Sequence, residues 1–484
     1  MPFPIIRVLS FVLGIAGASL LPPLAASLWY GEGWRCVTAW LAPAAASWVC
    51  GAALWMLRRR GGGGSGGGMG QLEARSAFRL VGGVWVAMGL FGALPLFFSG
   101  AYPSFTDAVF ESISGFTTTG ASVAVDVESL PHSVNLWRCM THWLGGMGVI
   151  ALAVALVPLL GVGGFRLIKA ETTGPEKGRV TPRIADTAKA LWCIYAAMTL
   201  AQAVMLRISG LGWFDAFCHA FSTLGTGGFS TRNASVGAFA NPAADWICTV
   251  FMLLASVNFA LYYRLFTRRL DDVAHDSELR AFIAIVAAAI LGVTLVETGD
   301  YGSFGESLRF SSFQVASLIS TTGFMTADYA AWHGAAQVIL FALFFIGGCS
   351  GSTAGGIKVI RWTVLAKQLR NEFRRILHPR EVVTLRINGS PGREDFVPPI
   401  AAFIFMYLML VMAASLAGAI AGLGLVESIS AALSMVGNIG PAFGQMGPTA
   451  NYAAIPDALK WVYSFVMLAG RLEIYTMLIL VRVV

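Results

Sequence analysis

Ten apolar segments of about twenty residues each recur along this chain of 484 residues, and they constrain its fold more than any other feature. They begin near Val8, Val37, Phe78, Val134, Ile184, Trp246, Ala281, Ala335, Ile400 and Leu459. A helix of ~20 residues crosses the ~30 Å hydrocarbon core of a bilayer. Hydrophobic residues make up 56% of the chain and charged residues only 12%, which excludes a soluble globular protein. The sequence therefore predicts an all-α integral membrane protein with ten transmembrane helices.

Basic residues gather in the loops that follow every second apolar segment. These clusters lie at 58–60, 166–183, 264–269 and 358–386. The alternate loops carry acids instead: Asp107, Asp126, Glu128, Asp215, Asp300, Glu306 and Asp328. Cytoplasmic loops are enriched in Lys and Arg, so we expect the basic loops and both termini on the cytoplasmic side of the membrane. The net charge of +7 follows from these clusters and does not indicate nucleic-acid binding.

The first sixty residues read as an extra transmembrane hairpin. Arg7, the apolar run after it and the stretch "PPLAAS" would also suit a secretory signal peptide. Cleavage would leave nine crossings and break the alternation of charge, so we favour a retained helix. The stretch "GGGGSGGGMG" has no side chains to pack and predicts a flexible linker over residues 61–75.

The rest of the chain consists of four copies of one unit, at 76–165, 184–270, 277–380 and 398–484. When Gly120, Gly228, Gly323 and Gly440 are set in register, the residue six places earlier is always a serine: Ser114, Ser222, Ser317 and Ser434. Thirteen places before the glycine stand three acids and one exception: Asp107, Asp215, Glu427 and Phe310. Such internal repeats are typical of membrane transport proteins.

Each unit contains a short amphipathic segment between two apolar ones. About a dozen helical residues span only ~18 Å, so this segment enters the membrane and must return as a re-entrant pore helix. An acid at its start suits the positive end of the helix dipole. The negative ends of the four segments would then face a common axis.

The loops that follow these segments predict a cation-selective filter. Irregular backbone at membrane depth persists only where it is buried in protein or lines a watery path. Rings of backbone carbonyls can replace the hydration shell of a monovalent cation, and glycine allows the carbonyls to turn. The predicted ion-binding residues are Thr118, Thr119, Gly120, Thr226, Gly227, Gly228, Thr321, Thr322, Gly323, Asn438, Ile439 and Gly440. The alternative is that these are glycine-rich helix-packing motifs, which are common in membranes.

Four motifs identify a family resemblance: "HWLGGMGVI" (142–150), "GGFSTRNAS" (227–235), "STTGFMT" (320–326) and "GRLEIYTMLIL" (470–480). Together they resemble the Trk/Ktr/HKT superfamily of potassium transporters, and the opening hairpin resembles the bacterial TrkH branch. The resemblance covers the chain from Phe78 to its end. It implies four helix–pore-loop–helix units around one pore, a homodimer in the inner membrane, and regulation by TrkA, a cytosolic nucleotide-binding ring protein.

The resemblance also bears on selectivity. Family members with serine at the first filter glycine tend to conduct sodium, so Gly120 favours potassium. Unit two has Gly227 where the other units have Thr119, Thr322 and Ile439, and unit four has Pro441 after its glycine. We therefore expect a filter that is less regular than one built from four identical chains.

A glycine-rich run, "GGCSGSTAGG" (347–356), interrupts the second helix of unit three. The order of a phosphate-binding GxxxxGK[ST] loop is absent, and a simple helix kink is the plainer alternative. The family resemblance instead implies an intramembrane loop that closes the cytoplasmic side of the pore. The predicted gate residues are Gly347, Gly348, Ser350, Gly351, Ser352, Thr353, Gly355, Gly356 and Arg471.

Arg471 is a charged residue inside the last apolar segment. Charged groups at membrane depth are costly and face a cavity or a partner. The resemblance assigns Arg471 to the pore cavity, where its charge would lower cation occupancy. A structural salt bridge is the alternative, although residues two apart such as Arg471 and Glu473 do not face each other on a helix.

The remaining reactive residues indicate no other chemistry. The seven cysteines form no CxxC pair and suit helix packing. His142 and His219 suit hydrogen-bonded core positions better than metal sites. A membrane-embedded enzyme would need a nucleophile with a base, a metal cluster or paired carboxylates, and we find none of these in the sequence. The function predicted from the sequence is potassium uptake driven by the membrane potential, with a sodium or ammonium conductor of the same fold as the alternative. No organic cofactor is expected.

Overall fold

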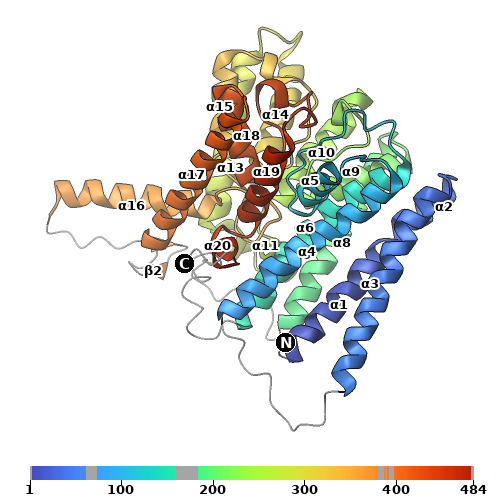
Figure 1. Ribbon diagram of the computed structural model, residues 1–484. Coiled ribbons are helices and arrows are strands. Elements are labelled where there is room, and N and C mark those ends of the chain that lie inside the picture. Colours follow the sequence, from blue (N-terminus) through green and yellow to red (C-terminus); the bar gives the residue numbers. More distant parts are fainter. Residues whose placement is uncertain are drawn as a thin grey trace.

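The computed structural model describes residues 3–60, 74–159, 184–379, 386–387, 390–391 and 397–480. Within these ranges the regular structure is helical, as predicted, apart from one antiparallel pair of two-residue strands. These strands are β1 (Arg386–Ile387) and β2 (Ser390–Pro391). The predicted linker up to residue 73 and the basic segment 166–183 lie outside the described residues. Figure 1 shows the helices gathered into one body from which α16 (Val359–Leu377) projects to the side.

The N-terminal helices form a hairpin at one edge of the molecule. The hairpin consists of α1 (Phe3–Ser19), α2 (Leu21–Trp29) and α3 (Trp34–Arg60), and α1 lies beside α3 (Figure 1). Its tip is tied to the rest of the protein by side chains. Glu32 Oε1 accepts the backbone N–H of Ser133 at 2.8 Å, and Arg35 Nε donates to the carbonyl of Phe98 at 3.2 Å. The hairpin is therefore docked on the first repeat.

Each predicted unit begins with a long apolar helix. These helices are α4 (Ala74–Ser99), α8 (Ile184–Ile208), α13 (Ser277–Glu297) and α17 (Val397–Ile420). Together with α3 and the α1–α2 segment they make six helices, among the described residues, that are long and apolar enough to cross a membrane. A seventh is a bent pair, α10 (Pro242–Ala255) and α11 (Phe259–Phe266), whose axes differ by 93°. The chain is thus a multi-pass membrane protein.

A short helix follows the long helix in every unit. The short helices are α5 (Phe105–Phe116), α9 (Trp213–Gly225), α14 (Phe304–Ile319) and α18 (Leu425–Gly437). All four carry an acid in the first turn, where it complements the helix dipole: Asp107, Asp215, Glu306 and Glu427. Unit three looked exceptional only because α14 begins earlier relative to the glycine, with Ser303 as its N-cap accepting the N–H of Glu306 at 3.2 Å.

The helix that closes each unit is continuous only in unit one. There it is α6 (His132–Leu159), whereas unit two has the bent α10–α11 pair. In unit three a loop separates α15 (Gly334–Leu343) from α16, and in unit four a break separates α19 (Asp457–Arg471) from α20 (Tyr475–Leu480). The sequence predicted the break in unit three alone. Short helices complete the connections: η1 (Ser235–Phe239), α12 (Leu270–Ala274), η2 (Tyr329–Ala331) and η4 (Gly444–Met446).

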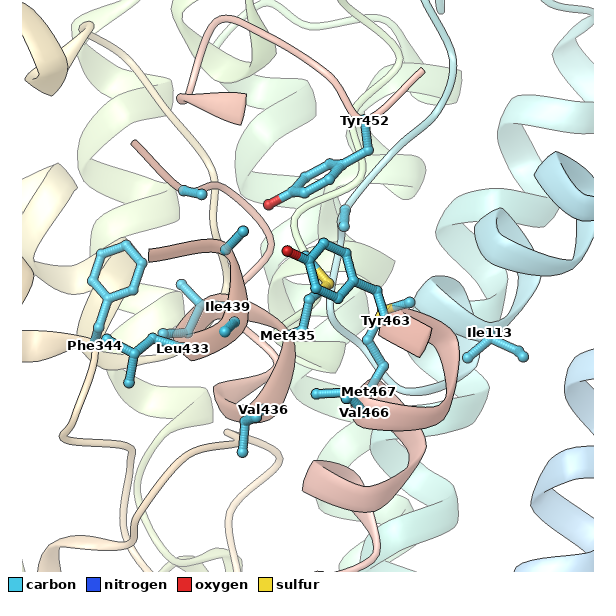
Figure 2. Close-up of a cluster of buried hydrophobic side chains, with 14 of the residues drawn as sticks. Ile113, Phe344, Leu433, Met435, Val436, Ile439, Tyr452, Tyr463, Val466 and Met467 are labelled. Atoms are coloured by element: carbon cyan, nitrogen blue, oxygen red, sulfur yellow. The ribbon is translucent and has the colours of Figure 1, made fainter. Parts of the chain in front are cut away.

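The largest buried apolar cluster joins units one, three and four with the N-terminal hairpin. Figure 2 shows part of it, in which Leu433, Met435, Val436 and Ile439 from the end of α18 lie near Tyr463, Val466 and Met467 of α19. This packing holds the end of α18 against α19. The glycine loop of unit four therefore starts from a rigid support.

Candidate functional site

Four loops with the same backbone conformation follow the short helices. In each loop a polar residue adopts a left-handed φ of 54° or 55°, and the glycine two residues later also has a positive φ. The polar residues are Thr118, Thr226, Thr321 and Asn438, and the glycines are Gly120 (78°), Gly228 (84°), Gly323 (80°) and Gly440 (102°). Non-glycine residues seldom adopt this conformation. The register read from the sequence thus aligns positions that share one backbone geometry.

The four loops form a closed ring. A Cβ atom on Gly120 would lie 1.8 Å from the carbonyl oxygen of Gly227, which is far inside van der Waals contact. The equivalent distances are 2.1 Å from Gly228 to Thr322, 2.2 Å from Gly323 to Ile439 and 2.5 Å from Gly440 to Thr119. Each loop therefore contacts the next in chain order, and the fourth contacts the first. Only glycine fits at the four contact points.

The repeated serine marks the point at which each short helix ends. In every unit the residue before the ring glycine donates its N–H to the carbonyl of that serine, five residues earlier. The pairs are Thr119–Ser114 (2.9 Å), Gly227–Ser222 (2.8 Å), Thr322–Ser317 (2.9 Å) and Ile439–Ser434 (2.9 Å). This bond closes the helix C-terminus, and the residue directly before the N–H donor is left-handed in all four units. All four serine side chains are buried, so a small residue suits the position.

Unit two differs from the others because a histidine ring takes the place of a side chain. A Cβ atom on Gly227 would lie 2.1 Å from His142 Cγ. His142 Nδ1 lies 2.8 Å from the carbonyl oxygen of Gly115, and its Nε2 accepts the N–H of Phe229 at 3.2 Å. His142 thus joins the end of α5 to the loop of unit two, in the hydrogen-bonded core position that the sequence favoured. His219 is similar, with Nε2 2.9 Å from Ser230 Oγ.

Unit four differs through a side-chain amide. Asn438 Nδ2 donates to Thr119 Oγ1 at 2.9 Å and to the carbonyl of Met467 at 3.0 Å. Tyr452 Oη donates to the carbonyl of Gly440 at 2.8 Å, and Figure 2 shows its hydroxyl pointing toward the segment that carries Ile439. The asparagine therefore ties the last loop to the first loop and to α19.

A buried ion pair supports the first two loops, and the sequence reading missed it. Arg138 Nε lies 2.8 Å from Glu111 Oε1, and both side chains are almost fully buried. Glu111 also accepts the Ser122 hydroxyl at 2.8 Å and the Val123 N–H at 2.9 Å. Arg138 reaches the carbonyl of Ser230 at 3.2 Å. A charged residue inside an apolar segment was the available signal, the same one that singled out Arg471.

The tip of the glycine-rich run lies against the ends of three short helices. The Thr353 hydroxyl donates to the carbonyl of Leu224, near the end of α9, at 2.9 Å. The Gly355 N–H donates to Thr321 Oγ1 at 2.7 Å, and a Cβ atom on Gly355 would lie 2.4 Å from the carbonyl oxygen of Gly437. The loop at 344–358 therefore contacts units two, three and four directly beside the ring, which is more than a helix kink would require.

Arg471 lies beside the same loop. Its NH1 group donates to the carbonyl of Thr353 at 2.7 Å and its NH2 group to the carbonyl of Gly145 at 3.4 Å. The guanidinium is buried, and Glu473 pairs instead with Arg361. The two hydrogen bonds of Arg471 thus go to backbone carbonyls of units three and one. Arg471 therefore links the loop to unit one.

The chemistry available at the ring is that of carbonyl and hydroxyl oxygens. Among the described residues, no cluster of three or more His, Cys, Asp or Glu side chains could hold a metal ion. Oxygen dipoles without a fixed carboxylate suit a monovalent cation, whereas rings of carboxylates favour divalent cations or cations in general.

Comparisons with known proteins show the family of this chain. The family signature described as the cation transport protein TrkH matches residues 45–484. The Trk system potassium uptake protein TrkH of Halomonas elongata is 38% identical over 482 residues, which cover 98% of this chain and 97% of that protein. The TrkH protein of Escherichia coli is 37% identical over 97% of this chain and 96% of its own length.

A solved structure has the same fold. The crystal structure of the potassium transporter TrkH from Vibrio parahaemolyticus superposes with a TM-score of 0.87 at 35% identity. The superposition covers 99% of this chain and 98% of that one. The chain belongs to the TrkH family of cation transport proteins, and it is a membrane transporter rather than an enzyme.

Proposed function

We propose that this protein takes up potassium through a pore at the centre of the ring of four glycine loops. The closed ring, in which each glycine excludes a side chain, is the observation that carries the proposal. The relatives named as Trk system potassium uptake proteins point to the same cargo. An interior potential of about −100 mV would favour inward movement by ~2.3 kcal/mol per charge.

The proposed filter is formed by the residues 118–120, 226–228, 321–323 and 438–440. Their carbonyls would replace water around the ion, with hydroxyls as a further layer of oxygen ligands. The left-handed conformation shared by the four loops supports one role for all of them. The different contacts of Gly227 and Asn438 support a filter whose four quadrants are not equal.

The proposed gate consists of the loop 347–356 and Arg471. The contacts of Thr353 and Gly355 with the helix ends support this role, because a segment in that place would close the path below the ring. The charge of Arg471 would repel a cation that passes it. Movement of the loop and of Arg471 together would open the path.

The finer architecture is also a proposal. Seven spans are described above. Ten crossings follow if α6 also crosses the membrane, and if α15 with the loop after it and α19 with α20 each make one further crossing. The domain limits proposed are a hairpin at 1–60, a linker at 61–75, and the four units given above. The pattern of basic loops supports an inner-membrane protein with both termini in the cytoplasm.

The partners proposed are a second copy of this chain and a cytosolic, TrkA-like, nucleotide-binding ring. The family resemblance supports both. Helix α16 carries Arg370, Arg374 and Arg375 on an exposed surface that would suit a cytosolic partner, and Figure 1 shows it projecting from the body. A ring bound there could pull on the loop that precedes α16.

Ion flux into liposomes containing the purified protein tests the function. We expect potassium and rubidium to enter faster than sodium and lithium, with empty liposomes as the control. Equal entry of sodium, or a preference for ammonium, would identify the alternative conductor of the same fold. Absence of flux for every cation, in protein that is folded and dimeric, would overturn the proposal.

A further inference from the structure

The two ends of the glycine-rich loop meet in a narrow neck. The Gly347 N–H donates to the carbonyl of Ile357 at 2.9 Å, and the Val359 N–H donates to the carbonyl of Gly348 at 3.2 Å. The residues between these bonds leave and return at the same place. The tip that touches the ring is therefore carried on a base made of residues 347–350 and 357–360.

One carboxylate oxygen bridges this neck. Glu278 Oε1 accepts the N–H of Ser350 at 2.7 Å and the N–H of Ile360 at 3.1 Å. Ser350 lies in the segment that leads into the loop, and Ile360 lies in the first turn of α16. Glu278 lies in the first turn of α13, and its residue exposure is only 7%. An acid buried at a membrane-spanning helix is costly unless it has such donors.

The break between α10 and α11 in unit two also supports the base of the loop. The Cys349 N–H donates to the carbonyl of Ser256 at 2.8 Å, and the Phe259 N–H donates to the carbonyl of Gly351 at 3.1 Å. These bonds lie at the break between α10 and α11. Residues 349–351 are thus held by backbone groups of unit two and by the Glu278 side chain.

From this arrangement we infer that Glu278 is a positioning residue that pins the neck of the loop, so that the tip holds its closed position against the ring. The inference rests on the proposed role of the loop as the gate. The acceptor oxygen is the part of Glu278 that matters, because it satisfies the buried N–H groups of both Ser350 and Ile360. Loss of that oxygen would loosen the neck and raise the population of open loop.

Cys349 is a natural probe of the neck. It follows Gly348, is 1% exposed, and reports on the base rather than on ion movement. The experiment measures alkylation of Cys349 by N-ethylmaleimide, quantified at this residue by mass spectrometry of the full-length protein in liposomes. Basal potassium flux and the ratio of potassium to sodium flux are measured on the same preparations.

Three variants separate the acceptor oxygen from the charge and the reach of the side chain. Glu278→Ala should raise the alkylation rate of Cys349 by about tenfold, which corresponds to ~1.4 kcal/mol of lost closure. It should also raise basal flux and leave the ion ratio unchanged. Glu278→Gln keeps an acceptor oxygen and should stay close to wild type in both measurements. Glu278→Asp keeps the charge but not the reach, so it should resemble the alanine variant, and it serves if that variant fails to fold.

The control is Arg280→Gln, an exposed substitution two residues along the same helix that should change neither measurement. A wild-type alkylation rate in both Glu278→Ala and Glu278→Asp would overturn the inference, as would a glutamine variant that behaves like alanine. Faster alkylation with wild-type flux has a different meaning. It would support the pinned neck and show that the loop is not the gate, so the inference and the proposed function can fail separately.

Discussion

The imidazole ring of His142 fills the space into which a side chain on Gly227 would project. The equivalent residues of the other units are Thr119, Thr322 and Ile439, so unit two has exchanged a local side chain for one supplied by α6. This exchange explains in steric terms why the glycine of unit two differs. It also predicts that the two positions are energetically coupled.

A double-mutant cycle tests that coupling. Gly227→Ala in the wild-type background should destabilise the protein by ~1–3 kcal/mol, because the new methyl group overlaps the imidazole ring of His142. The same substitution in a His142→Ala background should cost less, with a coupling of about 1 kcal/mol or more. Thermal unfolding of the purified variants is the measurement. Additive effects would mean that the imidazole of His142 moves aside without any cost in free energy of unfolding.

Substitutions at the ring glycines should change selectivity. Gly120→Ser and Gly323→Ser each place a side chain against a backbone carbonyl of the next loop, at 1.8 and 2.2 Å for the first atom. We expect the preference for potassium over sodium to fall by about tenfold, or ~1.4 kcal/mol, in the liposome flux assay.

Gly210→Ser is the matched control for the ring variants. Gly210 also has a positive φ, of 112°, but nothing lies within 4 Å of its Cβ position. It therefore carries the backbone strain without the carbonyl contact. Unchanged ion ratios in both ring variants would argue that these loops do not select the ion.

Removing the charge of Arg471 should increase conduction. Arg471→Ala deletes a buried cation and its hydrogen bond to the carbonyl of Thr353, so both the repulsion and one contact of the closed loop are lost. A barrier lower by ~1.4 kcal/mol would raise basal potassium flux about tenfold. Arg471→Lys keeps the charge and should remain nearer to wild type. Flux equal to or below wild type in the alanine variant, at normal expression, would favour a purely structural role.

Shortening the loop should open the path without altering the filter. Deletion of Ser350–Ala354 removes the Thr353 contact with Leu224 and leaves the ring residues untouched. Basal flux should rise while the ratio of potassium to sodium flux stays the same. Wild-type basal flux in a folded, dimeric deletion variant would show that the loop is not the gate. A collapse of selectivity would assign it to support of the ring.

The buried pair of Glu111 and Arg138 should be essential for stability. Glu111→Ala leaves the guanidinium buried without its carboxylate and should lower the free energy of unfolding by ~3–5 kcal/mol. Glu111→Gln retains one acceptor oxygen, for either Ser122 or Val123, and should cost less. Thermal unfolding checks both, and a silent alanine substitution would contradict the supporting role of the pair.

Local signals in the sequence anticipated the repeated parts of this fold. The serine and glycine register holds because every short helix ends with the same backbone bond. Three acids marked helix starts. The acid of unit three, Glu306, was not recognised in this role because its helix begins earlier relative to the glycine, directly after the N-cap Ser303. The break after Ala255 has no glycine beside it, and the break after Arg471 has the single Gly470 rather than a glycine-rich run. At the second break even Glu473 and Ile474 adopt positive φ, which long-range contacts and not local preference must impose.

The contacts that close the ring were likewise beyond sequence reasoning. Nothing local to His142 shows that it faces Gly227, and nothing local to Asn438 shows that it bonds Thr119. Glu278 also looked like an ordinary acid at a helix start. These residues act across units, so their roles depend on how the units are placed.

The closed ring has a consequence for biosynthesis. Its last hydrogen bond joins Asn438 to Thr119, which are 319 residues apart in the chain. At translation rates of ~5–20 residues per second, roughly 15 to 60 seconds separate the synthesis of these two residues. The second and third loops are made within that interval, and the ring has an open side until the fourth loop follows them. A chain that stops before its fourth unit cannot complete the ring, so the proposed ion path would form only when synthesis is nearly finished.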